Sequence, residues 1–372
     1  MKPLRVILGL VLVLALIAGV NFDFLLGLGA YAVRHAVAVR LLILGLGIVL
    51  LLALIVWLKL NAFLALLLAS LAVGLLNGLA PDAALKSMLA GIGGTMGSLA
   101  LILAFGAMLG KLIEESGAAH TITYWLTDLF GEKRIQLSVM ITGFLVGLPM
   151  IYNASFLTLI PLIYTFSVVT RKPLMMLGIP LSSALSVTHG YLPPHPAPTA
   201  IAQLYGADPN VTLLYGLALA APATFLAGPF LARFFRHLRN QPPPELFTER
   251  QFRREELPGI GVSLLTMLMP VLLMLMGAVV TMAWKPSGPA ARAVAFFSDP
   301  NIALGTAVLV GIVALGRRRG RPMEDVMKGM GGAVGSIAMV LFIIAGGGAF
   351  KQVLLDSGTA ASINAVAQTL EC

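Results

Sequence analysis

Two histidines, four prolines and several hydroxyl side chains are concentrated in residues 182–202, where the sequence reads SSALSVTHGYLPPHPAPTAIA. Proline removes a backbone donor and breaks a helix, whereas Ser, Thr and His supply replacement hydrogen-bonding groups inside a membrane. We therefore predict the tip of a helical hairpin within the protein, followed by a helix that begins near Thr199. The N-terminal amides of that helix would favour a carboxylate. A surface loop between two membrane spans is the alternative.

The groups of this motif that could contact a small anion form the predicted substrate-binding set. They are Ser186, Thr188, His189, Gly190, Pro193, Pro194, His195 and Thr199. The segment therefore predicts a site for a small anion.

Two enzyme-like interpretations of this segment have less support. The histidines have no cysteine or carboxylate close in sequence, Asp208 being the nearest acid, so a zinc site is disfavoured. Ser182, Ser183 and Ser186 could suggest an intramembrane serine hydrolase, but neither GxSG nor HExxH is present. We expect no enzymatic activity, no metal and no cofactor. An intramembrane hydrolase or a metal protein is kept as the alternative from a different class.

The composition places these residues in a membrane protein. Of the 372 residues, 58% are apolar and 11% are charged, and the mean hydropathy is +0.94. A soluble domain has about 25% charged residues, so this chain has too few to cover a water-facing surface. A soluble enzyme and a disordered chain are both excluded. The expected fold class is an all-α polytopic membrane protein with the lipid bilayer as a partner.

Apolar runs and basic clusters alternate along the chain. The runs that could span or enter the bilayer lie near residues 6–31, 41–58, 62–80, 96–113, 135–152, 155–169, 174–192, 211–232, 260–283, 300–316 and 333–350. Basic residues cluster at 233–254 and at 317–321, which favours a cytoplasmic location for both. The net charge of +9 is therefore assigned to membrane orientation, and no nucleic-acid partner is expected.

An internal repeat relates the two parts of the chain. Residues 91–98 (GIGGTMGS) match residues 329–336 (GMGGAVGS) at every glycine and at the final serine. Downstream, KLIEESG at 111–117 resembles KQVLLDSG at 351–358. Duplicated halves are usual in secondary transporters, whose substrate site lies where broken helices of the two halves meet. We expect two repeated, inverted halves with broken helices and re-entrant hairpins.

The repeat predicts four segments. They are an extra N-terminal hydrophobic segment at 1–40, repeat 1 with the His/Pro hairpin at 41–237, a cytoplasmic linker at 238–256 and repeat 2 at 257–372. Nothing in repeat 2 matches residues 135–232, so we expect the second half to be incomplete and the chain ending at Cys372 to be poorly functional. For residues 1–33, an uncleaved span and a misassigned start codon are the alternatives.

Several ordered motifs resemble the gluconate permeases, which are proton-coupled sugar-acid symporters of the bacterial inner membrane. The similarity covers about residues 41–370 and includes NAFLALLLASLAVGLLNG, GIGGTMGSLALILAFGAMLGKLIEESGAA, FGEKRIQLSVMITGFLVGLPM and, most specifically, SVTHG-LPPHP-PTAIA. It implies import of gluconate or a related sugar acid by proton symport, with the site around Ser186 to Thr199. A carrier for lactate or a dicarboxylate is the alternative, and a homo-oligomer is a candidate assembly.

Two positions depart from the pattern of that family. Just beyond the segment matching GFLVGLPM, the family commonly carries an acidic residue after an aromatic pair, and this chain has Asn153. An amide cannot titrate near neutral pH, so proton coupling here must use another group or be absent, with His189 or His195 as the substitute. Asn153 is kept in the predicted binding set. Ala197 replaces the family's glycine, which is expected to narrow the hairpin tip.

Overall fold

The computed structural model describes residues 22–238, 253–285 and 287–370. Within these ranges all regular elements are helical and none is a strand, so the predicted all-α class is confirmed. Seven of the described helical segments are long and apolar enough to cross a membrane. They are Val37–Val56, Pro81–Ser116, Tyr152–Thr170, Pro209–Phe235, Ile260–Trp284, Pro300–Arg319 and Met323–Asp356. The protein is a multi-pass membrane protein.

The chain divides into two compact units. Unit 1 combines Met1–Ala100 with Ala338–Cys372, and unit 2 is Leu101–Ile337. The helices that contribute to unit 1 are α2 (Phe22–Val56), α3 (Ala62–Leu76), the first part of α4 (Pro81–Ser116), the last part of α14 (Met323–Asp356) and α15 (Thr359–Leu370). Helix α2 continues without a break through residue 40, where the extra N-terminal segment was expected to end. Residues 1–21 of that segment lie outside the described residues.

Unit 1 has an apolar core to which four of its helices contribute. The buried side chains of this core are Ile43, Val73, Met88, Ala349 and Val353. Helix α3 begins where it does because the Asn61 side chain accepts a hydrogen bond of 2.8 Å from the Phe63 amide, which satisfies a free N–H of the first turn. Arg40 of α2 donates to the Gly358 carbonyl at 3.1 Å, which ties α2 to the start of α15.

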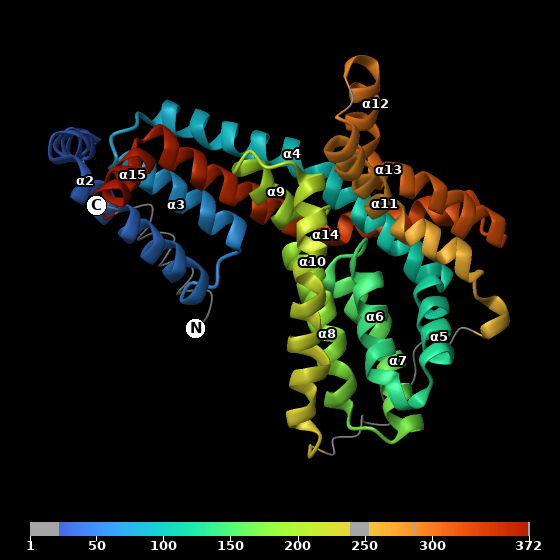
Figure 1. Ribbon diagram of the computed structural model, residues 1–372. Helices are drawn as coiled ribbons and strands as arrows, with labels where there is room; N and C mark the ends of the chain where they lie inside the picture. Colours follow the sequence, from blue (N-terminus) through green and yellow to red (C-terminus); the bar gives the residue numbers. More distant parts are fainter. Residues whose placement is uncertain (1–21, 239–252, 286, 371–372) are drawn as a thin grey trace. The chain divides into compact units, whose positions relative to one another are not determined.

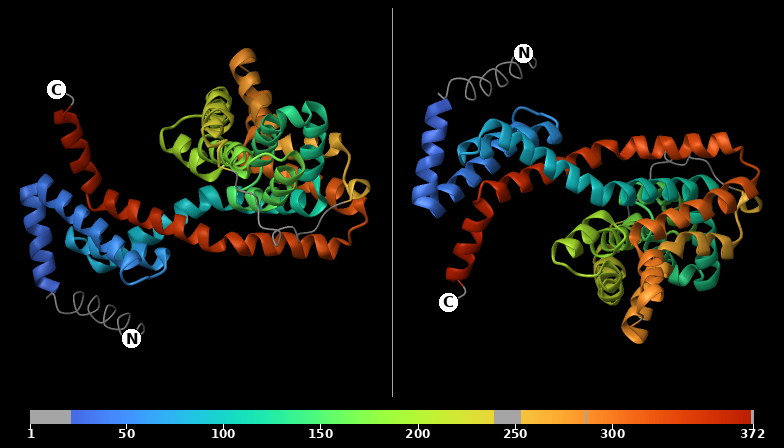
Figure 2. Two further views of the ribbon diagram at one scale, coloured as in Figure 1. Left: turned by 90° about the horizontal axis from the view of Figure 1, so that it is seen from below. Right: turned by 90° about the horizontal axis from the view of Figure 1, so that it is seen from above.

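Helices α4 and α14 carry the two glycine-rich segments. They contain 36 and 34 residues and continue through 91–98 and 329–336, so they begin well before the spans expected at 96–113 and 333–350 (Figure 2). In unit 1, a Cβ atom on Gly91 would overlap the carbonyl oxygen of Gly348. The glycine therefore permits close contact of the two backbones, as is common for small residues between membrane helices.

Unit 2 contains the predicted hairpin. Its further helices are α5 (Ala118–Phe130), α6 (Ile135–Gly147), α7 (Tyr152–Thr170), α8 (Leu174–Tyr191), α9 (Pro196–Leu204), α10 (Pro209–Phe225), α11 (Ile260–Trp284), α12 (Gly288–Ser298) and α13 (Pro300–Gly311). Helix α8 packs against α6, α7 and α10, and α10 also contacts α11 (Figure 1). The apolar core between them includes Leu148, Val187, Leu192, Leu213, Val271 and Met274.

Charged groups join three segments at one end of unit 2. Arg254 forms two hydrogen bonds with the Asp128 carboxylate, at 3.1 and 3.3 Å, and Arg319 donates to the carbonyl of Glu256. The Arg319 contact connects the described end of the expected linker to the second basic cluster. Residues 239–252 of that linker lie outside the described residues.

Candidate functional site

The His/Pro motif forms a buried turn between α8 and α9. Helix α8 ends at Tyr191, and Pro196 occupies the first position of α9, with His195 as its N-cap residue. We predicted that this helix begins near Thr199, but it begins three residues earlier, because proline is well suited to the first helical position. Helix α9 has nine residues, about 13 Å, which is too short to cross a hydrocarbon core of about 30 Å. The helix therefore breaks inside the structure.

Burial distinguishes this turn from an ordinary surface loop. Leu192, Pro193, Pro194 and His195 are all buried, and the Pro193–Pro194 peptide bond is cis. Backbone bonds close the turn, since the Leu192 amide donates to the Thr188 carbonyl at 3.2 Å and the His195 amide to the Leu192 carbonyl at 3.1 Å. A connecting loop in water would expose these groups. The turn is thus packed within the helices of unit 2.

The two histidines of the motif contact one another. Nδ1 of His189 lies 3.2 Å from Nδ1 of His195, and the two rings meet edge to face with centroids 4.7 Å apart. Nε2 of His195 lies 2.8 Å from the carbonyl oxygen of Gly147, at the end of α6. His195 is 4% exposed, whereas His189 is half-buried. The structure therefore brings together the two histidines of the predicted binding set.

Gly147 also explains how α6 and α8 come close enough for this contact. A Cβ atom at residue 147 would overlap the hydroxyl oxygen of Thr188 and lie 3.0 Å from a methyl carbon of Leu185. The Thr188 hydroxyl is buried and donates to the Ala184 and Leu185 carbonyls of its own helix, both at 3.0 Å. Gly147 thus supplies both space and a hydrogen-bond acceptor. Gly147 is not among the site residues predicted from the sequence.

The remaining predicted residues lie at different depths. Thr199 is fully buried in the first turn of α9, and its hydroxyl has no hydrogen-bond partner among the described residues. Gly190 and Asn153 are exposed, and Asn153 lies at the start of α7. Ser186 is also exposed, on α8 one turn before His189. No hydrogen bond or ring contact described in the structure links Asn153 to the histidine pair.

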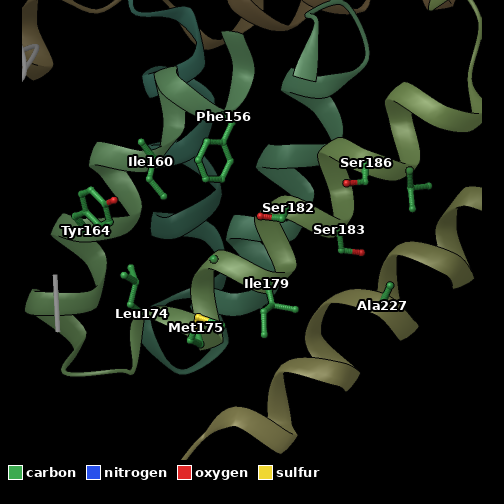
Figure 3. Close-up of a pocket in the computed structure, with 12 residues that line it drawn as sticks. Phe156, Ile160, Tyr164, Leu174, Met175, Ile179, Ser182, Ser183, Ser186 and Ala227 are labelled. Atoms are coloured by element: carbon green, nitrogen blue, oxygen red, sulfur yellow. The ribbon is translucent and has the colours of Figure 1, made fainter. Parts of the chain in front are cut away.

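A cavity of about 540 Å³ lies beside Ser186. Phe156, Ile160 and Tyr164 line it from α7 at intervals of four residues, which places them on one helix face, and Ser182 and Ser186 line it from α8 (Figure 3). Figure 3 shows the Ser182 hydroxyl directed toward the α7 side chains. Tyr164 is not among the residues predicted from the sequence, and Ser182 was expected there only as a candidate hydrolase residue. The four-residue spacing on both helices was the signal that could have found this face.

Ser183 has a structural role at the opposite side of α8. Its hydroxyl donates to the carbonyl of Thr224 at 3.2 Å, where α10 continues into the π-helical turn η2 (Leu226–Phe230). Pro229 lies five residues after Thr224, the spacing of a π-helical hydrogen bond, and has no N–H to donate. Ser183 therefore gives the Thr224 carbonyl a side-chain donor beside a π-helical turn that contains Pro229. This accounts for Ser183 without invoking a nucleophile.

Metal binding has no support from the geometry. Within the part of the chain that the structure describes, no three His, Cys, Asp or Glu side chains come together in an arrangement that could hold a metal ion. The histidine pair has two imidazoles and a backbone carbonyl around it, whereas a zinc site takes three or four side-chain ligands.

Comparison with known proteins identifies the family. The chain matches the model of the family described as GntP family permease over residues 39–372. The chain belongs to the GntP permease family. It is 47% identical over 319 residues to the "High-affinity gluconate transporter" of Escherichia coli (strain K12), covering 86% of this chain and 73% of that protein. No solved structure matches the chain.

Two further relatives extend this comparison. The "Gnt-II system L-idonate transporter" of Escherichia coli (strain K12) is 43% identical over 318 residues, which are 86% of this chain and 72% of the relative. The "Gluconate permease" of Bacillus subtilis (strain 168) is 41% identical over 328 residues, 86% of this chain and 73% of the relative. GntP permeases are carriers, so the expectation of a transporter and not an enzyme is confirmed. The chain is a multi-pass protein of the bacterial inner membrane.

Proposed function

We propose that this GntP permease imports gluconate or a related sugar acid by proton symport, with alternating access to the two sides of the membrane. The observation that carries the proposal is the buried contact of His189 with His195 at a broken helix of a chain that belongs to a permease family. Polar groups at membrane depth are retained where they serve a substrate or proton pathway. Named relatives that carry gluconate or idonate support the substrate class.

The arrangement around the turn suits an anion that carries hydroxyl groups. The first turn of α9 has the positive end of a helix dipole, which favours a carboxylate. Its amide donor is that of Ala197, because Pro196 and Pro198 have no N–H and the Thr199 amide donates to the His195 carbonyl. The cavity beside Ser186 adds the hydroxyls of Ser182 and Tyr164 one or more turns along α8 and α7. We propose that the carboxylate binds near the turn and that the hydroxylated carbon chain extends toward this cavity.

We also propose that the two repeats are inverted and include the segments 41–237 and 257–372, with 238–256 as the cytoplasmic linker and 1–40 as an added segment. Two contacts support this. In unit 1, Gly91 of α4 meets Gly348 of α14, and in unit 2 the repeat partner of Gly91, Gly329, meets the carboxylate of Glu115 on α4. In both contacts the glycine-rich N-terminal part of one helix, α4 or α14, packs against the C-terminal part of the other. Two copies related by a two-fold axis produce this reciprocal pairing.

The test is uptake into proteoliposomes. The protein, expressed from its own reading frame, is reconstituted with an alkaline interior, and labelled gluconate is added to an acidic exterior. Accumulation that a protonophore abolishes is the expected result. Uptake that reaches only the external concentration would contradict coupling, and no uptake of any sugar acid would contradict the proposed function.

Competition defines the substrate. Unlabelled L-idonate and gluconate should reduce the uptake of labelled gluconate, whereas lactate and a dicarboxylate should not, because they lack the polyhydroxylated chain that the serine-lined cavity would contact. Stronger competition by lactate would favour the alternative carrier. The assembly state, for which we propose a homo-oligomer, is measured on the same preparation by light scattering in detergent.

A further inference from the structure

The hydrogen bonds of the histidine pair determine which ring nitrogens carry hydrogen. A carbonyl oxygen only accepts, so Nε2 of His195, 2.8 Å from the Gly147 oxygen, must be the donor. In a neutral imidazole the other nitrogen is then an acceptor, which leaves Nδ1 of His195 to accept from Nδ1–H of His189 across 3.2 Å. Both nitrogens of His195 are thereby engaged. The lone pair on Nε2 of His189 is the basic site that is left.

The burial of the two rings also favours His189 over His195 as the ring that carries a positive charge. His195 is 4% exposed, so a cation on its ring would lose nearly all of its hydration. His189 is half-buried, and no described polar group lies within hydrogen-bond distance of its Nε2. A second proton on His195 would also have to enter at Nδ1, where it would face the N–H of His189. Protonation at Nε2 of His189 leaves every hydrogen bond of the pair in place.

Few ionisable groups surround His189. Helix α8 packs against α6, α7, α9, α10, η2 and, near its other end, the short turn η3 (Arg233–Phe235). The ionisable side chains on these elements and on α8 are His195, Tyr152, Tyr164, Tyr191, Tyr215 and Arg233. Thr224 contacts Ser183, and Gly228, four residues later, contacts Pro180, which lies further from His189 along α8. The segment that leads to Arg233 therefore runs away from His189. None of these described elements carries a carboxylate to neutralise an imidazolium.

From this geometry we infer that His189 is the residue that binds the transported proton, at Nε2, and that His195 is a positioning residue that holds the ring through Nδ1. The inference rests on the proposed proton symport. The proton adds to the Nε2 lone pair and converts the imidazole to an imidazolium, while the bond to His195 is retained. Release to the other side restores the neutral ring. Since none of the described elements that pack against α8 carries a carboxylate, we take the carboxylate of the substrate as the group that balances the charge of the cation.

Transport assays with matched variants test the assignment. His189→Gln should lose gradient-driven accumulation by at least tenfold but retain counterflow, in which labelled substrate exchanges for unlabelled substrate without net proton movement. His195→Gln keeps an amide N–H for the Gly147 carbonyl, and it should transport more slowly with an unchanged dependence on the pH gradient. Loss of coupling in His195→Gln, together with retained coupling in His189→Gln, would overturn the inference. Absence of transport by the unaltered protein would instead count against the proposed function.

A spectroscopic measurement tests the same point without transport. The protein, which has five histidines, is labelled with ¹⁵N-histidine and placed in bilayers, and the two variants assign the signals of residues 189 and 195. We expect His195 to remain a neutral ring with hydrogen on Nε2 while His189 acquires a second proton as the pH falls. A ring at 195 with hydrogen on Nδ1, or one that is protonated before His189, would contradict the assignment.

Discussion

Arg321 forms an ion pair with Glu115, which precedes it by 206 positions in the chain. Glu115 lies in the last turn of α4, and Arg321 lies just before α14. Lys111, four residues before Glu115 on α4, adds a second cation at 3.5 Å from the same carboxylate, but Arg321 makes the closer contact. Each side chain of the Arg321–Glu115 pair is 24% exposed. A local pairing rule could find Lys111 but not Arg321.

The first prediction concerns this ion pair. Arg321→Gln should lower the free energy of unfolding by about 1–2 kcal/mol, because a partly buried carboxylate loses a charged donor while Lys111 and solvent compensate in part. Chemical denaturation in mixed micelles measures the change. The control is Lys86→Gln, whose pair with Asp82 is 79% and 71% exposed and should contribute almost nothing. Equal effects of the two variants would contradict a special role for Arg321.

A second prediction uses two glycines of α4. Gly91→Ala should destabilise unit 1 by about 1–3 kcal/mol, since the added Cβ atom overlaps the Gly348 carbonyl and must separate the helices. Gly93→Ala, two residues later, meets nothing within 4 Å and should raise stability by up to about 1 kcal/mol through helix propensity. Thermal unfolding of the purified variants gives the sign of each change. A destabilising Gly93→Ala would show that glycine itself is needed along this whole stretch.

The third prediction concerns the approach of α6 to the histidine turn. Gly147→Ala should reduce transport severely and stability by about 1–3 kcal/mol, because the methyl group displaces Thr188 and moves the acceptor of His195. Gly261→Ala on α11, which has open space around the added atom, is the comparison and should leave both properties near the original values. Uptake and unfolding are measured on the same preparations. Full activity of Gly147→Ala would show that the acceptor position is not critical.

Ser183 and Pro229 support a fourth prediction. Ser183→Ala should cost about 1 kcal/mol of stability, because the Thr224 carbonyl loses a side-chain donor. In the background of Pro229→Ala the cost should shrink, since the new backbone N–H can donate within the helix. A double-mutant cycle measures this coupling. Additive effects would mean that Pro229 does not leave the carbonyl in need of Ser183.

The sequence predicted the fold class and the helical break well, and the local physics explains why. The prolines beside His195 remove backbone hydrogen-bond donors, and this effect depends only on residue type, so the helix break can be predicted from the sequence. The start of α9 was misplaced by three residues, because the run of prolines contains several residues suited to the first helical position. Continuous α4 and α14 were cut short, since glycine lowers helix propensity although close packing against another backbone compensates for it.

The site was less predictable than the fold. Contacts that join distant segments, such as His195 with Gly147, depend on how α6 meets α8 and leave no local pattern. Glycine at residue 147 is indistinguishable in sequence from glycines that meet nothing, such as Gly178. Asn153 was placed in the binding set by its position in a motif, but the structure gives it an exposed location at the start of α7. The residue type of Asn153 alone does not determine whether its side chain points toward the site or toward the surface.

The lengths of α4 and α14 have a consequence for the surrounding lipid. Charges occur only near the ends of each helix, and the uncharged stretches between them, residues 87–110 and 329–350, span about 36 and 33 Å at about 1.5 Å per residue. Both stretches exceed a hydrocarbon layer of about 30 Å, and such an excess is accommodated by tilting, by kinking or by local thickening of the bilayer. A bilayer of shorter acyl chains increases this mismatch for both helices. Lipid chain length should therefore alter the free energy of this permease in the bilayer through hydrophobic mismatch, even where no lipid is specifically bound.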